Sequence, residues 1–414
     1  MARLLLLIPT TSYRVGDFMA AAERLEVDLV IGSNQSPVLA EFAAERSLAL
    51  DFTDIAEGCR QIEAYAAAYP LEAILGVDDE TLLLAASASQ VLGLTHNTPD
   101  SVIATRNKYR FRVALANAGP PSPEFRLVDI AADDARQAAR AAPYPCVLKP
   151  LALAAGRGVI RADDESAFIA ARLRIAAILE SPDVAAVQGE AARQILVESY
   201  IPGIEVTLEG LLHDGRLEIL ALFDKPDPLV GPYFEETILT TPSRLPAAER
   251  QQIAATAQTI VVALGLRHGP IHAEFRVNDK GVWPLEMAAR SIGGLCGRVL
   301  RFSAGFSLED LILRHALGLP ATDRHAEPRP GGVMMIPIPR AGTLRQVRGL
   351  EDARAVAGID DITISIALGR PVTPPPEGYR YLGFIFARAD SPEAAEAALR
   401  EAHARLEIDI DESG

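Results

Sequence analysis

The sequence is poor in cysteine, in positive charge and in long apolar runs, and each shortage excludes a class of protein. Its three cysteines lie far apart without a Cys-x-x-Cys pair, which excludes a zinc ribbon or a thioredoxin-like site and suits a reducing compartment. Lysine and arginine number 40 against 55 acidic residues, a net charge of −15 that argues against partners such as nucleic acid or an anionic membrane. The run Leu4 to Ile8 is too short for a secretory or membrane-spanning segment. We therefore expect a cytoplasmic protein.

The composition is otherwise that of a folded protein with more than one core. Hydrophobic residues make up 49% of the 414 positions and charged residues 23%, which excludes wholesale disorder. The chain shows no internal repeat and no low-complexity tract. At roughly 100–200 residues per domain, this length predicts about two to four domains.

The first hundred residues predict an open α/β domain. Short apolar runs alternate with amphipathic helical stretches, a pattern typical of a parallel sheet covered on both faces. We expect strands at 3–9, 27–32, 48–52 and 71–77, and helices at 17–25, 36–46, 55–68 and 81–92. The first strand runs into Pro9-Thr10-Thr11 without a glycine fingerprint, so dinucleotide binding is not predicted.

The rest of the chain predicts mixed α and β structure. One helix is expected at 99–118 and a longer one at 246–264. Strands are expected at 194–198, 205–212 and 217–223, the last two joined by a turn at His213-Asp214-Gly215. A second hairpin is expected at 271–277 and 281–286. After Pro320, strands at 333–337, 362–367 and 382–387 and a closing helix at 391–404 predict a small α+β unit.

Two lysines and a small-residue loop are candidates for holding phosphate groups. Lys149 ends the apolar run Val147-Leu148, where a lysine is costly to bury without an anionic partner. Ala154 to Val159 follows, and its small residues allow successive N–H groups to form an anion nest beside Arg157. Lys108 lies in the helical stretch before them. The alternatives are a lysine at a strand edge that reaches water and a flexible turn.

A strand that ends in a Pro-Gly break is a candidate for binding a purine nucleoside. In the segment Val197 to Glu205, free backbone groups at the break can pair with the edge of a base. The carboxylate of Glu205 can accept hydrogen bonds from ribose hydroxyls. The alternative is an ordinary turn followed by an exposed acid.

The second predicted hairpin is a candidate magnesium site. Residues two apart on a strand share a face, which aligns His272, Glu274 and Arg276. Glu286 follows on the paired strand, and two carboxylates on paired strands suit magnesium bridging two phosphates. The alternative is a surface ladder of salt bridges. The small-residue loop Ser291 to Gly294 favours an anion pocket instead.

Taken in order from about Asn107 to Gly297, these segments resemble the ATP-grasp superfamily. They are similar to the branch of bacterial L-amino acid ligases and related carboxylate–amine ligases, as are Phe223 to Pro226, Gly231 to Thr237, Thr241 to Ser243 and Arg290 to Cys296. The resemblance implies an N-terminal open parallel α/β domain over 1–100 and an ATP-grasp domain over 101–326. It further implies a mobile β-rich subdomain at about 150–225 and a small α+β C-terminal lid over 327–414.

The same resemblance implies cofactors and roles. ATP and magnesium, or manganese in its place, would be the cofactors. The residues that would contact ATP are Lys108, Lys149, Gly156, Arg157, Gly158, Glu198, Tyr200, Ile201 and Glu205. Glu274 and Glu286 would bind the metal. The catalytic residues would be Arg290, Gly293 and Gly294, and the substrate residues would be Lys225, Glu236 and His272.

By this resemblance the chain would be an ADP-forming ligase. A carboxylate would attack the γ-phosphate of ATP, and an amine would then displace phosphate from the acyl phosphate to leave an amide. The partners would be small carboxylates and amines of the amino-acid class, and a homodimer is compatible with the resemblance. Ala288 departs from the asparagine that many members carry two residues after the second metal-binding glutamate. This departure keeps open an ATP-binding regulatory or partner protein without turnover. A biotin-dependent carboxylase subunit is a weaker alternative, because the chain shows no biotin-carrier segment.

Overall fold

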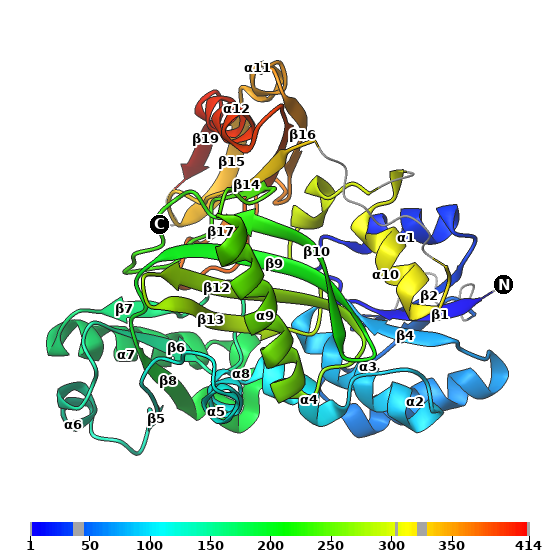
Figure 1. Ribbon diagram of the computed structural model, residues 1–414, viewed down its shortest axis with the longest axis horizontal. Coiled ribbons are helices and arrows are strands. Elements are labelled where there is room, and N and C mark those ends of the chain that lie inside the picture. Colours follow the sequence, from blue (N-terminus) through cyan, green and yellow to red (C-terminus); the bar gives the residue numbers. More distant parts are fainter. Residues whose placement is uncertain (1, 36–44, 303–304, 321–328, 412–414) are drawn as a thin grey trace.

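The structure is a computed structural model that describes residues 2–35, 45–302, 305–320 and 329–411, with side chains except at 186–190. The helix predicted at 36–46 lies almost wholly outside the described residues. An N-terminal unit, a unit built on a small sheet and a C-terminal unit surround one large central sheet (Figure 1). Among the described residues, no helix combines the length and apolar character needed to cross a membrane.

The N-terminal unit is the predicted open α/β domain. Its sheet has the strand order β3-β2-β1-β4 and is parallel throughout, as the continuous apolar strands predicted. The side chains of Leu4 to Leu7 in the inner strand are completely buried. The strands are β1 (Arg3–Leu7), β2 (Asp28–Ser33), β3 (Ser47–Ala49) and β4 (Ala73–Gly76), and the helices are α1 (Val15–Arg24), α2 (Ile55–Ala68) and α3 (Asp79–Leu92).

The single helix predicted at 99–118 is wrong, because the chain forms two helices. Helix α4 (Pro99–Arg106) ends at Asn107, which has extended backbone angles, and α5 (Lys108–Ala118) begins directly after it. The side-chain oxygen of Asn107 accepts the N–H groups of Tyr109 and Arg110 at 3.1 Å, which caps α5. The break turns the N–H of Lys108 towards the carbonyl of Leu151, 2.9 Å away at the end of a neighbouring strand.

The small sheet is antiparallel, with the strand order β5-β8-β6-β7. Helix α7 packs its buried face, which includes Phe168 and Ile175, on this sheet. The elements are β5 (Phe125–Asp129), β6 (Cys146–Pro150), β7 (Ile160–Ala162), β8 (Gln194–Ser199), α6 (Ala135–Arg140), α7 (Glu165–Leu179), α8 (Pro182–Gln188) and the 3-10 turn η2 (Gly189–Arg193).

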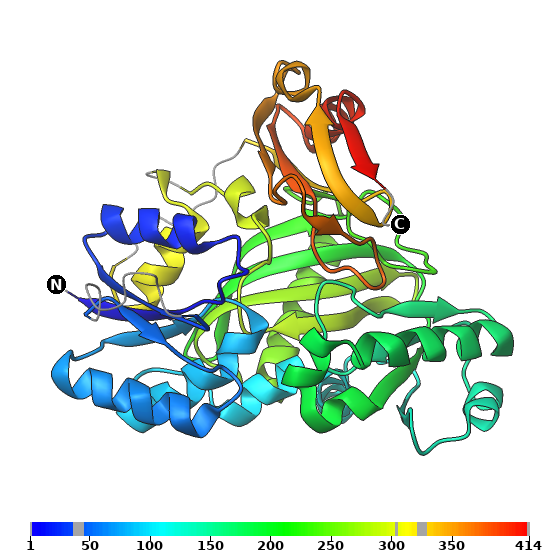
Figure 2. The ribbon, with the colours of Figure 1, turned by 180° about the vertical axis from the view of Figure 1, so that it is seen from behind.

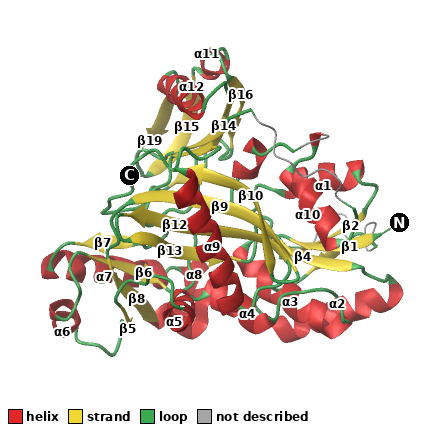
Figure 3. Ribbon diagram, in the orientation of Figure 1, coloured by secondary structure: helices red, strands yellow, loops and turns green. Residues whose placement is uncertain are grey.

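The central sheet has eight strands in the order β13-β12-β9-β10-β11-β14-β18-β16. Both predicted hairpins, β9–β10 and β12–β13, lie in it side by side. Helix α9 (Ala247–Leu264) lies across one face of the sheet (Figure 3), and Gly265 ends it in the left-handed conformation. The strands contributed before the C-terminal unit are β9 (Ile204–His213), β10 (Arg216–Asp224), β11 (Ile238–Thr241), β12 (Gly269–Asn278) and β13 (Gly281–Ala288).

The C-terminal unit continues the central sheet, which therefore crosses the predicted domain boundary at 327. Strands β14 (Gly331–Ile336), β18 (Gly383–Arg388) and β16 (Ile359–Ile364) extend it, and α12 (Pro392–Ala404) packs on them. A three-stranded sheet completes the unit with β15 (Gly342–Arg348), β17 (Pro371–Val372) and β19 (Glu407–Asp411), beside α11 (Leu350–Arg354). Figure 2 shows this unit from behind, above the central sheet.

The subdomain predicted at about 150–225 spans strands of two different sheets. Strands β6 to β8 belong to the small sheet, whereas β9 and β10 belong to the central sheet, and the chain passes between the two at the Pro202-Gly203 break. That this region is mobile remains a prediction.

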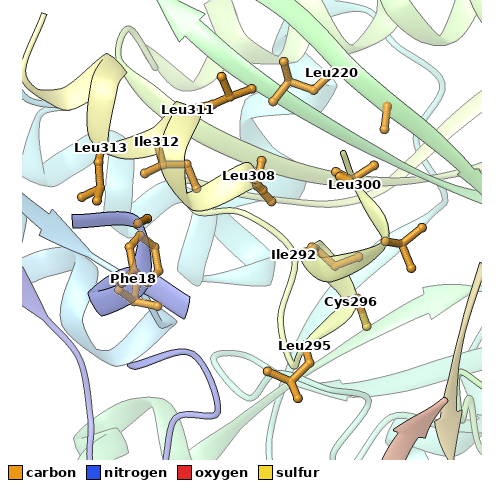
Figure 4. Packing of buried hydrophobic residues seen from close by; sticks show 14 of the residues in the cluster. Phe18, Leu220, Ile292, Leu295, Cys296, Leu300, Leu308, Leu311, Ile312 and Leu313 are labelled. Atoms are coloured by element: carbon orange, nitrogen blue, oxygen red, sulfur yellow. The ribbon is translucent and has the colours of Figure 1, made fainter. Parts of the chain in front are cut away.

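An apolar cluster joins the N-terminal unit to the loops that follow β13 (Figure 4). Phe18 of α1 belongs to it, together with Leu308 and Ile312 of α10 (Leu308–Ala316) and residues of the 3-10 turn η3 (Cys296–Val299). Ile292 and Leu295 of the preceding loop are buried in the same cluster. The loop predicted as an anion pocket is therefore packed between two units of the fold.

Candidate active site

A cavity of about 580 Å³ lies where the N-terminal unit, the small sheet and the central sheet meet. All the residues predicted for the site from sequence line it except Gly158 and Lys225. Lys225 is buried directly beneath the lining, in contact with three glutamates that do line the cavity. Segments far apart in the sequence thus converge on one cavity.

Lys149 lies inside this cavity and does not reach out to solvent. Its Nζ lies 2.6 Å from Oε2 of Glu198, and the other carboxylate oxygen, Oε1, accepts from Nε of Arg112 at 2.5 Å. Burial alone would raise the pKa of Glu198, but Arg112 and Lys149 outweigh it and lower that pKa to about 2. Burial lowers the pKa of Lys149, although Glu198 acts in the opposite direction. Two cations therefore share one carboxylate, which leaves positive charge available to an anionic ligand.

Lys108 is held between the small sheet and the predicted metal site. Its Nζ donates to the carbonyl of Leu153 at 2.8 Å and lies 3.1 Å from Oε2 of Glu286. The Asn107 break places the lysine there, because α5 starts at this position. Lys108 and Lys149 therefore face the same space from opposite elements.

The small-residue loop after Lys149 has the tight backbone that was predicted. Ala155, Gly156 and Gly158 have positive φ angles of 54°, 67° and 72°. A Cβ at Gly156 would lie 3.0 Å from the carbonyl oxygen of Phe234, so this position has little space for a side chain. The loop thus brings backbone directly to the cavity wall.

Arg157 and Gly158 point to other partners. Nη1 of Arg157 lies 2.6 Å from Asp183, and its guanidinium lies 4.9 Å from the centre of the Tyr379 ring. The N–H of Gly158 donates to the carbonyl of Pro376 at 2.9 Å, which ties the loop to the C-terminal unit. A contact of Arg157 with phosphate remains a prediction.

The Pro-Gly break supplies fewer free backbone groups than the sequence suggested. The N–H of Tyr200 donates to Pro145 at 2.8 Å, and the carbonyl of Ile201 accepts from Arg276 at 2.5 Å. Within the part of the chain that the structure describes, the N–H of Ile201 has no acceptor. This N–H group is therefore the available donor for the edge of a base.

Glu205 is a buried, paired acid and not the exposed one of the alternative interpretation. Its carboxylate lies 2.9 Å from Nε of Arg276 and 2.8 Å from Nζ of Lys225. The ring of Tyr200 lies beside the same arginine, 5.0 Å from its guanidinium carbon. Two cations thus fix the acid at the cavity wall, and an aromatic ring packs against one of them.

Lys225 is surrounded by three carboxylates, those of Glu205, Glu236 and Glu274. Burial would lower the pKa of the lysine, but the three acids outweigh it and raise that pKa well above its ordinary value. Burial, with repulsion from Glu274, raises the pKa of Glu236 to about 7 against the pull of Lys225. One oxygen from each acid lies within 4.8 Å of the others, which is close enough to share a cation.

The predicted metal hairpin has the expected register. Glu274 and Glu286 are direct partners across β12 and β13, and both line the cavity. Their ion pairs among the described residues join them to lysines and to His272, not to cross-strand arginines. The surface-ladder alternative is therefore wrong.

His272 pairs with a buried acid that no sequence motif indicated. Its Nδ1 lies 2.5 Å from Oε1 of Glu209, a residue of β9 with 1% of its surface exposed. Burial would lower the pKa of His272, but Glu209 and Glu274 outweigh it and raise that pKa to about 9. The imidazole is therefore charged at neutral pH.

The N-terminal unit contributes one wall of the cavity. Thr11 to Tyr13 follow β1, Asn34 follows β2, and Asp78 to Glu80 follow β4, so the lining comes from the carboxyl ends of parallel strands. Oδ2 of Asp79 lies 2.7 Å from Nη2 of Arg290. Asp79 outweighs the effect of burial and raises the pKa of Arg290 further above its ordinary value. The side chain of Arg290 is thus fixed at the cavity.

Three partners of predicted residues were missed, namely Arg112, Glu209 and Asp79. Glu209 left a signal, because Glu205, Thr207 and Glu209 alternate on one face of an otherwise apolar strand. Arg112 left a weaker one, one helical turn after Lys108. The pairing of Asp79 with Arg290 left none, since the two residues are 211 positions apart.

The fold thus gathers two lysines, a glycine-containing loop and a pair of carboxylates of this protein at one cavity. Comparisons with known proteins identify its kind. The ATP-grasp domain family matches residues 142–299, the ATP-grasp N-terminal domain family matches 19–96, and the L-amino acid ligase C-terminal domain 2 family matches 334–411.

Individual proteins agree with these matches. The crystal structure of L-amino acid ligase from Bacillus licheniformis superposes with a TM-score of 0.84 at 25% identity, over 99% of both chains. Formate-dependent phosphoribosylglycinamide formyltransferase of Xanthomonas oryzae pv. oryzae is 30% identical over 310 residues, 72% of this chain and 70% of its own. Carnosine synthase 1 of Gallus gallus is 29% identical over 260 residues, 60% of this chain but only 27% of that longer protein. The chain belongs to the ATP-grasp superfamily, among the ATP-dependent carboxylate–amine ligases.

Proposed function

We propose that the protein is an ADP-forming ligase that joins a carboxylate to an amine, with amino acids as both substrates, through an acyl phosphate. The observation that carries this proposal is the single cavity, in which Lys108, Lys149 and two register-paired glutamates lie next to Arg290 and a glycine loop. The similarity to L-amino acid ligase over the whole chain supports amino acids as the substrates.

Lys108 and Lys149 would bind the phosphates of ATP, and the N–H of Ile201 would bind the base. The carboxylate of Glu205 would accept hydrogen bonds from the ribose hydroxyls. Each lysine already faces a carboxylate, so binding ATP would exchange that carboxylate for a phosphate as the anionic partner. The lysines would therefore have an anionic partner both before and after binding. We expect the loop at Gly156 to close over the phosphates through its backbone N–H groups.

The carboxylates fit a divalent cation with hard oxygen ligands. Glu274 and Glu286 would hold magnesium, or manganese, which offsets the charge of the phosphates when bound. Glu236 would add a third oxygen beside Glu274, and this offers a physical reason why Ala288 need not abolish activity. Its raised pKa leaves it partly protonated near neutral pH until a cation binds.

The other end of the cavity would carry out the acyl transfer. Arg290 and the N–H groups of Gly293 and Gly294 would stabilise charge that develops on the acyl phosphate and the tetrahedral species. The charged His272 and Glu236 would position the substrates. Tyr13 and Tyr381 line the same end and both pack edge-on against Phe384, at 5.6 and 6.0 Å. They would form an aromatic wall for a substrate side chain.

The test is a screen of amino-acid pairs with ATP and magnesium. We expect equal amounts of ADP and of a product whose mass is that of the two substrates less one water. Hydroxylamine in place of the amine substrate should trap the acyl phosphate as a hydroxamate. ADP release without either product would contradict ligation.

A second candidate, an ATP-binding protein without turnover, is favoured by Ala288 alone. This residue is buried opposite His272 and offers no oxygen to a metal. Tight ATP binding with no ADP release across the same screen would support this candidate over the ligase.

A further inference from the structure

The loop that follows β13 is held at one residue, Ile292, by side chains from two other parts of the chain. The N–H of Ile292 donates to Oε2 of Glu209 at 2.9 Å, and its carbonyl accepts from Nη1 of Arg14 at 3.3 Å. Ile292 itself is buried. Because both backbone groups of this residue are anchored, its φ and ψ angles have little freedom.

Arg14 comes from the N-terminal unit, outside every segment predicted for the site. Only 3% of its surface is exposed. Nη1 also donates to Oγ of Ser291 at 2.8 Å, and Nη2 lies 2.8 Å from Oε1 of Glu309 at the start of α10. The guanidinium lies over the ring of Phe18, 5.0 Å from its centre. A buried arginine whose two terminal nitrogens both have partners has little freedom to reorient, since turning away from Glu309 would leave buried charge unpaired.

Fixing the carbonyl of Ile292 also fixes the N–H of Gly293, because the two groups belong to one peptide plane. That peptide bond is trans, so the N–H points away from the guanidinium. Within the described part of the chain, the N–H groups of Gly293 and Gly294 have no acceptor, although both residues line the cavity. Backbone donors without a protein partner at a cavity wall are available to a ligand anion.

We infer that Arg14 is a positioning residue for acyl transfer. It acts through the peptide between Ile292 and Gly293 and so orients the N–H groups of Gly293 and Gly294. This inference rests on the proposed function. It gives the N-terminal unit a part in the reaction beyond the wall that it adds to the cavity. Arg14 is absent from the lining of the cavity, so its effect would be on geometry and not on binding of the nucleotide.

The test compares Arg14→Met with Arg24→Met. Arg24 of α1 forms an ion pair with Asp310 of α10 at 2.7 Å, and so links the same two helical regions without touching the 291–294 loop. Arg14→Met should lower kcat for amide formation on the order of a hundredfold, the scale of a small misplacement of reacting groups, and leave the KM for ATP unchanged. Arg24→Met should keep the wild-type kcat.

Two further variants guard against a folding defect. Arg14→Met leaves the buried carboxylate of Glu309 without its ion-pair partner. The double variant Arg14→Met/Glu309→Gln removes that charge and should show the same loss of kcat. Arg14→Lys keeps a positive charge for Glu309 but lacks the planar guanidinium that contacts Glu309 and the 291–292 backbone and side chain together. Its kcat should lie between those of the wild type and Arg14→Met.

Amide hydrogen exchange over 290–295 supplies a readout that needs no turnover. Exchange in this segment should be faster in Arg14→Met than in the wild type or in Arg24→Met. If the wild type forms no amide product, the proposed function fails, and exchange alone decides whether Arg14 positions the loop. Arg14→Met protein with the exchange and kcat of Arg24→Met would overturn the inference.

Discussion

The two ends of the cavity are built in different ways. At the nucleotide end, Lys149, Glu198 and Glu205 follow one another along β6, β8 and β9, with Lys108 close before them. At the transfer end, Asp79, Arg290 and Tyr381 come from the N-terminal, central and C-terminal units. The first end is a local motif whose parts lie near one another in sequence, whereas the second exists only when three units are packed together.

This difference predicts where a substitution acts. Changes at the nucleotide end disturb buried ion pairs and should show in stability, because each cation there already has an anionic partner. At the transfer end, changes to the groups aimed at a substrate should show in turnover, and an effect on stability is expected only where a side chain also pairs with a buried acid, as His272 does with Glu209. Four experiments test the contrast.

The largest effect is expected from Arg112→Met at the nucleotide end. It leaves the buried carboxylate of Glu198 with Lys149 as its remaining cation and frees the carbonyl of Pro284. Breaking a buried pair costs roughly 3–5 kcal/mol, so the free energy of unfolding measured with denaturant should fall by about that amount. The surface variant Arg60→Met, whose partner Glu57 is exposed, should change it by less than about 1 kcal/mol. Equal stability of the two variants would contradict the contrast.

The pair of His272 and Glu209 should make stability depend on pH. The pKa of His272 is raised to about 9 in the folded chain, so its contribution is complete below about pH 6.5 and disappears as the pH rises through 9. The size of the shift corresponds to roughly 3 kcal/mol. Thermal unfolding of His272→Gln should therefore lose this part of the slope between pH 6.5 and 9, while His96→Gln keeps it. An unchanged slope in His272→Gln would show that the pair contributes nothing.

Glu286→Gln tests the paired carboxylates between the two ends. It keeps the shape of the side chain but removes one charge from the proposed magnesium site, and turnover should fall on the order of a hundredfold or more. ATP affinity measured without magnesium should stay the same, because Lys149 and the contacts to the base remain. Glu274→Gln should behave similarly, and the exposed Glu180→Gln should match the wild type. Near-normal turnover of folded Glu286→Gln protein would refute the metal site.

The smallest effect is expected from Ala288→Asn, which restores a third oxygen on β13. If Glu236 already compensates, the magnesium concentration for half-maximal rate should fall only slightly in Ala288→Asn, but clearly in Glu236→Gln/Ala288→Asn compared with Glu236→Gln. Titration of the rate with magnesium measures both. If the magnesium requirement is the same in the wild type and Ala288→Asn, and the same in Glu236→Gln and the double variant, Glu236 is not part of the metal site. Its predicted role in substrate binding would then be the remaining one.

The sequence by itself determined the parts of this protein that depend on short-range pattern. Continuous apolar runs between amphipathic helices predicted the parallel N-terminal sheet, and turn residues between short strands predicted both hairpins. The order of motifs led to the superfamily, and nearly every predicted site residue lines one cavity. The break at Asn107 was missed, since a polar residue inside a helical pattern does not reveal whether its side chain caps a new helix.

Only the tertiary structure decided which partner each charged residue has. Asp79 meets Arg290, Arg14 meets Ser291 and Glu309, and Lys225 meets three glutamates, across separations along the chain that no local pattern records. Burial enforces these pairings, because a buried ion without a partner costs several kcal/mol. The units therefore have to pack so that each of these ions meets its partner. The residues of the site were therefore visible in the sequence, while the network that orients them was decided by how the units pack.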